Sequence, residues 1–376
     1  MFNMMSLNTI LKKILYLLCV GFVFQGYSQP CISHNRITSS LLGHLPVSFR
    51  GNLKPVWSYK TGDAIKSSLA ACQNIIIATS TDGNVYAINT KGEIIWTYKT
   101  GNSIESSPLI INNTVICSNL SGVVVALNLH SGKVLWKLNL EAQISGTANF
   151  YIKNSDTILV IPAYDYFLHA INLHKGTEVW KIETNNFLNG MAAVKNNELI
   201  IGGCDGFLHH VNLNAGKKIK QITIGTYITE SAAWPDSIAF IADYDGTFYA
   251  ININNSTVKW KYTTVAQAPF VSSPAVNNEK VIIGSHDKNV YCFNRYNGQI
   301  IWKTQTSGKI ESSPLIINNQ VIICSKDGYI RFLSLATGEI KAHYYIAEPI
   351  KGTPVIYDNL LLITTEKGVI YAFKQK

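Results

Sequence analysis

The sequence predicts an all-β fold, an eight-bladed β-propeller of four-stranded antiparallel blades, on three observations. Tryptophan recurs about every forty residues. Asn-Asn and Asp-Gly pairs, which suit tight hairpins, recur at matching places between the tryptophans. The repeats contain apolar runs of strand length and no helical periodicity. Repetition at this interval is typical of arrays in which each unit buries its apolar face against the next.

The tryptophan positions define the repeat length. Their successive spacings are 39, 40, 44, 80 and 42 residues. The spacing of 80 covers two repeats, with Lys220 at the position between, and one more period reaches Ala342. Burying an indole removes about 150–250 Å² from water, roughly 4–6 kcal/mol, so these side chains are expected to join neighbouring blades. The predicted structural tryptophans are Trp57, Trp96, Trp136, Trp180, Trp260 and Trp302.

Each repeat contains four predicted strands. In the repeat that begins at Lys309 they cover residues 310–317, 321–325, 329–334 and the segment that ends at Ala342. The turns between them fall at Asn318-Asn319, Asp327-Gly328 and Thr337-Gly338. The first strand begins with Ser-Ser-Pro or a variant of it, and such small residues fit the narrow end of a blade near the axis.

The last repeat lacks a fourth strand of its own. The chain ends at Lys376, just after the predicted strand over residues 369–373, whereas the segment 55–59 is left over at the N-terminus. We expect this segment to complete the eighth blade and to cover an edge that would otherwise aggregate. The propeller then spans residues 54–376. Residues 29–53 form an N-terminal leader with little repeat character, and removal of residues 29–50 is expected to be tolerated.

Residues 1–28 have the features of a secretory signal peptide. Lys12-Lys13 precede an apolar run over residues 14–24, and the small residues Gly26 and Ser28 suit cleavage before Gln29. Eleven residues cover about 16 Å as a helix, against roughly 30 Å of hydrocarbon, which favours cleavage over anchoring. The segment before Cys31 matches a lipoprotein cleavage site poorly. We expect a periplasmic or secreted monomer with no transmembrane segment in the mature chain.

Six cysteines remain after cleavage: Cys31, Cys72, Cys117, Cys204, Cys292 and Cys324. An even number in an exported protein favours disulfides. Four of the six, however, stand where other repeats carry Ile, Ala or Val, which is typical of small core residues. Free buried thiols are the interpretation that we prefer.

Charge and motifs exclude several function classes. The formal net charge of +9 is dispersed, whereas a nucleic-acid site requires a basic stripe with interleaved aromatics. The sequence contains no metalloprotease, serine-hydrolase or P-loop motif. His209 and His210 are adjacent in a predicted strand, so their side chains point to opposite faces. We therefore expect no catalytic, cofactor-binding or metal-binding residues, and a protein that is not an enzyme.

The segment Ala126-x-Asn128-x-x-Ser131-Gly132-Lys133-x-x-Trp136 resembles the tryptophan-docking motif of the PQQ-like, or quinoprotein-type, propeller family. The resemblance extends over about residues 54–376, with departures at Lys220 and Ala342. It implies the eight-bladed fold and leaves the function open, because this fold hosts dehydrogenases, assembly factors and sensors.

Within that family, the quinoprotein alcohol dehydrogenases hold PQQ beside calcium and an adjacent cysteine pair, which this sequence lacks. The BamB-type proteins of outer-membrane protein assembly are similar in length and in lacking cofactor chemistry. The resemblance implies a non-catalytic scaffold for a protein partner in the cell envelope. A PQQ-dependent dehydrogenase and an extracellular ligand- or carbohydrate-sensing module are the alternatives.

Two groups of residues are candidates for binding. Tyr164, Tyr166 and Tyr244 lie at hairpin turns of blades three and five, and aromatic residues on loops frequently anchor partners; packing between turns is the alternative. Lys66, Glu105, Glu311 and Lys351 follow the first-strand isoleucine in four blades that adjoin in a closed ring. They predict a charged axial patch that is either a binding surface or a self-neutralised, solvated opening.

Overall fold

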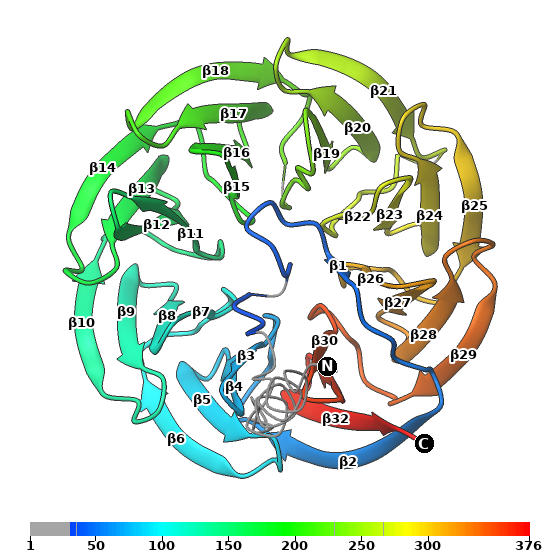
Figure 1. Cartoon of the computed structure of the whole chain (residues 1–376), viewed down its shortest axis with the longest axis horizontal. Helices are drawn as coiled ribbons and strands as arrows, with labels where there is room; N and C mark the ends of the chain where they lie inside the picture. Colours follow the sequence, from blue (N-terminus) through cyan, green and yellow to red (C-terminus); the bar gives the residue numbers. More distant parts are fainter. Residues whose placement is uncertain (1–30, 35, 229, 266) are drawn as a thin grey trace, which may run out of the picture. The chain divides into compact units, whose positions relative to one another are not determined.

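The computed structural model describes residues 31–34, 36–228, 230–265 and 267–376, which form a ring of eight blades (Figure 1). The predicted signal peptide lies outside these residues. Among the residues described, no helix is long and apolar enough to cross a membrane. The all-β, eight-bladed prediction is confirmed, and the blades follow one another around the ring in chain order.

Each blade is an antiparallel meander whose first strand lies nearest the axis. Blades 1 and 2 contain β3 (Ala70–Cys72), β4 (Ile75–Thr79), β5 (Asn84–Asn89), β6 (Ile94–Lys99), β7 (Leu109–Ile111), β8 (Thr114–Ser118), β9 (Val123–Asn128) and β10 (Val134–Asn139). Blades 3 and 4 contain β11 (Asn149–Lys153), β12 (Asp156–Pro162), β13 (Phe167–Asn172), β14 (Glu178–Glu183), β15 (Ala193–Lys195), β16 (Glu198–Gly202), β17 (Phe207–Asn212) and β18 (Lys217–Thr223).

Blade 5 contains β19 (Ile238–Ala242), β20 (Thr247–Asn252) and β21 (Thr257–Thr263), and its first strand is reduced to a bridge between Ala233 and Phe240. Blades 6 and 7 contain β22 (Ala275–Val276), β23 (Lys280–Gly284), β24 (Asn289–Asn294), β25 (Ile300–Gln305), β26 (Leu315–Ile317), β27 (Gln320–Cys324), β28 (Tyr329–Ser334) and β29 (Ile340–Tyr345). Blade 8 contains β30 (Val355–Tyr357), β31 (Leu360–Thr364) and β32 (Val369–Gln375).

The N-terminal strand β2 (Leu53–Lys60) closes the ring. It pairs antiparallel with the C-terminal strand β32, with Lys60 opposite Val369 and Leu53 opposite Gln375. Blade 8 therefore has four strands in the order β2-β32-β31-β30, as the sequence predicts. The chain's first long strand and its last one hold each other in place.

The six repeat tryptophans each contact the next blade of the ring. Trp96 in β6 illustrates the contact: its Nε1 donates to the Leu129 carbonyl of blade 2 at 2.8 Å. Its ring faces Gly132, where a Cβ atom would lie only 2.7 Å away, and the φ of 65° at Gly132 also favours glycine. Trp57, Trp136, Trp260 and Trp302 donate to carbonyls of the next blade. Trp180 packs against Gly216 of the next blade, while its Nε1 donates to the Tyr151 hydroxyl of its own blade.

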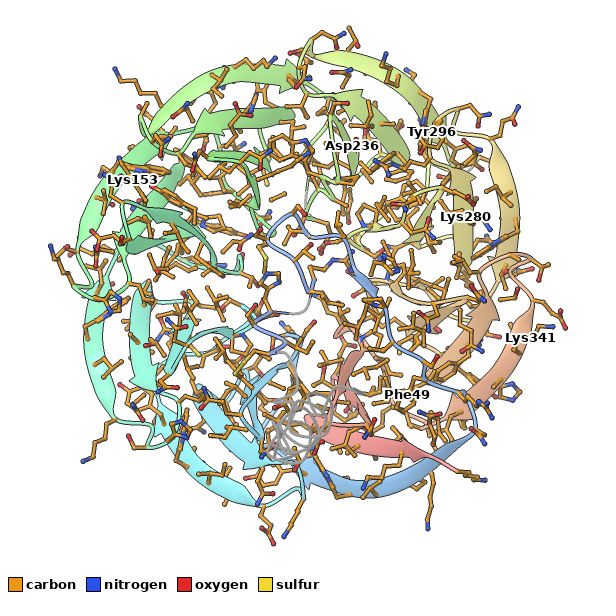
Figure 2. The ribbon with its side chains drawn as sticks, viewed as in Figure 1. Phe49, Lys153, Asp236, Lys280, Tyr296 and Lys341 are labelled. Carbon is orange, nitrogen blue, oxygen red and sulfur yellow. A yellow bond between two sulfur atoms is a disulfide. The ribbon has the colours of Figure 1, made fainter. Side chains whose placement is uncertain are left out.

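Two junctions lack a tryptophan and are filled differently. Lys220 donates from Nζ to the Asn254 carbonyl of blade 5 at 2.9 Å. At the other junction, the leader supplies the missing bulk: Phe49 stacks on Phe332 with ring centroids 6.5 Å apart, and Gly51 lies against Ala342. Figure 2 labels Phe49 near β2 and β32.

The leader is an inner lining of the ring, which the sequence did not predict. It runs through the centre and contacts blades 1 to 7 in chain order before it turns outward into β2 (Figure 1). Main-chain carbonyls of Ser39, Ser40, Leu42 and Gly43 accept from the first strands or equivalent segments of blades 4, 5, 6 and 7 at 2.8–2.9 Å. The short strand β1 (His44–Leu45) then pairs in parallel with β26.

The leader is also buried, since Ile32, Leu41, Leu45 and Phe49 are each at most 8 % exposed. These contacts argue against the expectation that residues 29–50 can be removed without harm, and we now expect the opposite result. Repeat character is absent from the leader because it lines the blades instead of forming one. Its contacts are made mainly by the backbone, which leaves little pattern in the side chains.

One disulfide ties the leader to blade 1. Cys31 is bonded to Cys72 of β3, with their Cα atoms 4.4 Å apart. The preference for free thiols is wrong for this pair, because the path of the leader, which brings Cys31 beside β3, has no signature in the sequence. Cys117, Cys292 and Cys324 are free and buried, and Cys204 is free and half-buried.

Candidate functional site

A cavity of about 390 Å³ lies on the axis, at the face of the ring where the first strands begin. All eight blades contribute to its wall, and Arg36 of the leader forms part of its floor. We call this cavity the axial cup. It is the size of a small-ligand site.

A ring of hydroxyl groups forms the wall of the cup. In six places the backbone N–H of one blade donates to the hydroxyl oxygen at the matching position of the following blade, at 2.8–3.3 Å. The donor–acceptor pairs are Ser68–Ser107, Ser107–Thr147, Met191–Ser231, Ser231–Ser273, Ser273–Ser313 and Thr353–Ser68. The recurrence of Ser or Thr in the inner-strand motif is thus explained by hydrogen bonds between blades as well as by small size.

The four predicted charged residues all line the cup. Lys66 and Glu105 form an ion pair at 2.7 Å. Glu311 lies 3.0 Å from Lys326 and 3.3 Å from His286. Burial opposes ionisation of Glu311, but these neighbours outweigh it and lower its pKa to about 2. Most of the predicted patch is therefore neutralised by pairs within the wall.

The floor contains a second charged group, formed by Arg36, Glu230 and Lys351. Arg36 is 1 % exposed, and its Nη1 donates to the Pro314 carbonyl at 3.2 Å while Nη2 donates to Pro274. Burial lowers the pKa of Arg36 to about 10, opposed by nearby Glu230. Burial raises the pKa of Glu230 to about 7, although Lys351, Ser273 and Arg36 favour its charged form.

Exposed aromatic side chains form a crescent over blades 3 to 5, across the axial cup from the four charged residues. The Tyr164 ring stacks on Phe187 at 4.7 Å, Tyr166 lies 5.2 Å from Phe187, and Tyr227 stacks on Tyr244 at 4.7 Å. Four of these rings keep 36–43 % of their surface exposed: Tyr166, Phe187, Tyr227 and Tyr244. The predicted tyrosines thus pack against neighbouring turns and still present ring surface to solvent.

Tyr166 occupies a backbone position that most blades reserve for glycine. Its φ is 72°, in the left-handed region, and the matching residues Gly83, Gly206 and Gly328 have φ of 77–83°. A bulky residue with this φ is strained. Tyr164 is held more firmly, since its hydroxyl donates to Asn189 Oδ1 at 2.5 Å.

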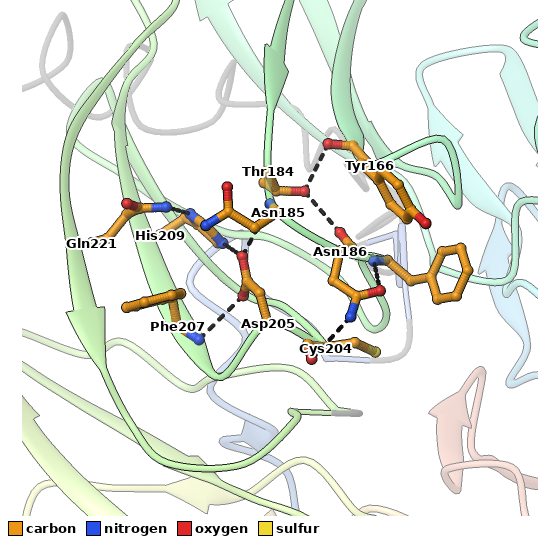
Figure 3. Close-up of polar contacts among 10 residues, drawn as sticks. Tyr166, Thr184, Asn185, Asn186, Cys204, Asp205, Phe207, His209 and Gln221 are labelled. Atoms are coloured by element: carbon orange, nitrogen blue, oxygen red, sulfur yellow. Dashed lines mark hydrogen bonds and ion pairs between the residues drawn. The ribbon is translucent and has the colours of Figure 1, made fainter.

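A partly buried polar network supports the loop that carries Phe187 (Figure 3). Asp205 accepts from the backbone N–H of Asn185 at 3.2 Å and lies 2.9 Å from His209 Nε2. Thr184 Oγ1 lies 2.7 Å from the Tyr166 carbonyl, and Asn186 Nδ2 donates to the Cys204 carbonyl at 3.4 Å. His209 therefore has a structural partner on its own side of the strand.

His210 faces the other side and pairs with Glu198 at 2.8 Å. Among the residues described, no three His, Cys, Asp or Glu side chains gather closely enough to hold a metal ion. The four free cysteines do not line the axial cup.

Sequence reasoning missed Phe187, Tyr227, Arg36 and Glu230. Phe187 and Tyr227 immediately precede the apolar residue that begins the Ser-Ser-Pro-type segment of blades 4 and 5. The other blades carry Ala, Ser, Gln, Pro or Lys at this position, so an alignment of the repeats could have identified the two rings as unusual. Arg36 could not be found in this way, because it belongs to the leader.

The fold and the docked tryptophans define the chain as an eight-bladed propeller of the PQQ-like repeat class. The family model described as outer membrane protein assembly factor BamB matches residues 52–146, 112–234 and 265–344. The chain belongs to this family. The comparison with curated proteins gives no match.

Solved structures show the same fold at low identity. BamB from Moraxella catarrhalis is 19% identical, with a TM-score of 0.73 over 86% of this chain and 98% of that one. The computationally designed Ika8 protein is 17% identical, with a TM-score of 0.75 over 85% and 99%. A quinohemoprotein alcohol dehydrogenase, ADHIIG from Pseudomonas putida HK5, is 13% identical, with a TM-score of 0.76 over 92% and 80%.

Proposed function

We propose that this protein is a non-catalytic scaffold of the cell envelope that binds a protein partner in an accessory role in outer-membrane protein assembly. The family supports the envelope setting. The disulfide agrees with it, since disulfides persist in oxidising compartments. The observation that carries the binding role is the aromatic crescent, because exposed, clustered aromatic rings are typical anchors of protein interfaces.

Tyr166→Gly tests this role. The substitution removes an exposed ring and relieves a φ of 72°, so the melting temperature is expected to stay the same or rise while co-purification with envelope partners falls at least tenfold. Partners are captured from native membranes and identified by mass spectrometry. Lys288→Gly, at the matching turn of blade 6 with a φ of 68°, provides the same backbone relief without removing an aromatic ring. Equal capture by wild type and Tyr166→Gly would contradict the interface.

The dehydrogenase alternative has a direct test. The axial cup does not fit the quinoprotein site, since no pair of cysteines adjoins it. Purified protein supplied with PQQ and calcium is expected to show no alcohol-dependent dye reduction and no thermal shift. A ligand at one hundred times its Kd stabilises the native state by about 2.7 kcal/mol, so a saturable shift of several degrees would overturn this expectation.

A further inference from the structure

The axial cup has more hydrogen-bond donors than its own residues use. The hydroxyl oxygens of Ser107, Thr147, Ser231 and Ser313 each accept a backbone N–H. Among the described residues, none of these four hydroxyls donates a hydrogen bond in turn. A hydroxyl that accepts from the protein keeps its O–H for another acceptor. Four O–H donors therefore remain around the axis.

The floor adds unused cationic donors. Arg36 Nε is buried and has no hydrogen-bond partner among the described residues, although a buried N–H without a partner is costly. Lys351 lines the cup and makes no hydrogen bond to the residues described. Lys66 and Glu311 are already paired within the wall. Arg36 and Lys351 thus both lie near the Glu230 carboxyl group, and Lys351 also lies near Glu311, which Lys326 already pairs.

The rim opposite the charged wall is aromatic. Tyr164 and Tyr244 line the same cup, and each stacks on a second ring. An aromatic face offers a flat apolar surface beside a polar hydroxyl edge. The cup therefore combines an oxyanion-binding floor, a hydroxyl wall and a stacking surface within one volume of about 390 Å³.

We propose that the axial cup binds an acidic sugar, with its carboxylate or phosphate on Arg36, Lys351 and the free hydroxyls. The apolar C–H face of the sugar ring lies against the tyrosine rim, and its hydroxyls exchange hydrogen bonds with the serine wall. This site shares Tyr164 and Tyr244 with the aromatic crescent, but its oxyanion anchors lie at the floor of the cup, so their substitution tests the sugar site apart from the proposed protein interface.

Isothermal titration calorimetry with three probes tests the site: glucuronate, glucose 6-phosphate and glucose. Saturable binding of either acidic sugar, with no binding of glucose, is the expected result, and the two acids distinguish a carboxylate from a phosphate ligand. The proposal is overturned if neither acid gives saturable heat at concentrations up to about 5 mM, because the binding free energy would then be weaker than about −3 kcal/mol. Equal binding of glucose also overturns it, because the oxyanion would then have no role.

Lys351→Gln is expected to lower the affinity for the acidic probe about tenfold, as for the loss of a charged hydrogen bond. Ser313→Ala is expected to lower it several-fold, as for the loss of a neutral one. The control is Lys341→Gln on the outer strand β29, which removes the same charge far from the cup (Figure 2). Its affinity should equal that of the wild type. Equal losses from Lys351→Gln and Lys341→Gln would reduce the effect to net charge and contradict the site.

The pH dependence has a defined sign. Glu230 faces Lys351, Arg36, Ser273 and Glu311, and its pKa of about 7 means that it becomes neutral as the pH falls from 8 to 6. The floor then loses a negative charge while glucuronate stays ionised, so affinity should rise several-fold. Glu230→Gln should remove most of this change. An unchanged pH profile in Glu230→Gln would show that the ligand does not lie at this floor.

Discussion

Deletion of residues 29–50 is expected to abolish accumulation of soluble protein, as fully as deletion of residues 29–60. The longer deletion removes β2 and exposes the edge of β32. The shorter one spares β2 but removes the leader, whose four buried apolar side chains contribute about 1.5–3 kcal/mol each. Their sum, about 6–12 kcal/mol, is comparable to the whole stability of a typical domain.

The measurement is the soluble yield of the exported protein and its melting temperature. A milder variant separates the effect of the disulfide from that of the leader's packing. The protein with Cys31→Ser and Cys72→Ser should remain soluble, and its free energy of unfolding should fall by about 2–4 kcal/mol. A soluble, cooperatively melting protein after deletion of residues 29–50 would show that the leader only covers the channel.

Trp302→Ala is expected to lower the free energy of unfolding by about 3–5 kcal/mol, the range for truncating a large buried side chain. Trp302 is 7 % exposed, and its Nε1 donates to the Leu335 carbonyl at 3.1 Å. The substitution would leave a cavity between blades 6 and 7, where the indole of Trp302 packs on Gly338. Chemical denaturation followed by intrinsic fluorescence gives the value.

Lys220→Ala is the matched control, because Lys220 occupies the tryptophan position of blade 4. It makes one exposed hydrogen bond, to the Asn254 carbonyl, so its loss should cost under about 0.5 kcal/mol. Similar costs at both positions would mean that the tryptophan contacts do not stabilise the ring more than an exposed lysine does.

The repeats were predictable because their residues obey local rules. Asp-Gly and Asn-Asn turns, apolar runs of strand length and a tryptophan at a nearly constant spacing each depend on neighbours within one repeat or the next. The ring closure was predictable as well, since one strand was missing at one end and one was spare at the other. Periodicity thus determined which residues face the axis, including Lys66, Glu105, Glu311 and Lys351.

The floor of the axial cup could not be predicted by the same means. Arg36 reaches it through a leader with no repeat register, and Cys31 meets Cys72 because of that same path. The state of Glu230 depends on burial among groups from four separate segments. Such effects arise from the assembled ring and leave no local pattern in the chain.

The pairing of β2 with β32 determines the order in which the molecule can fold. During synthesis or export, β2 emerges early, but its partner is more than three hundred residues further along the chain. Contacts between distant segments form slowly, and a strand that waits without a partner is prone to misassembly. The early strand must therefore be kept from other chains until the last residues arrive, so the folding of this ring should depend on chaperones of the compartment in which it closes.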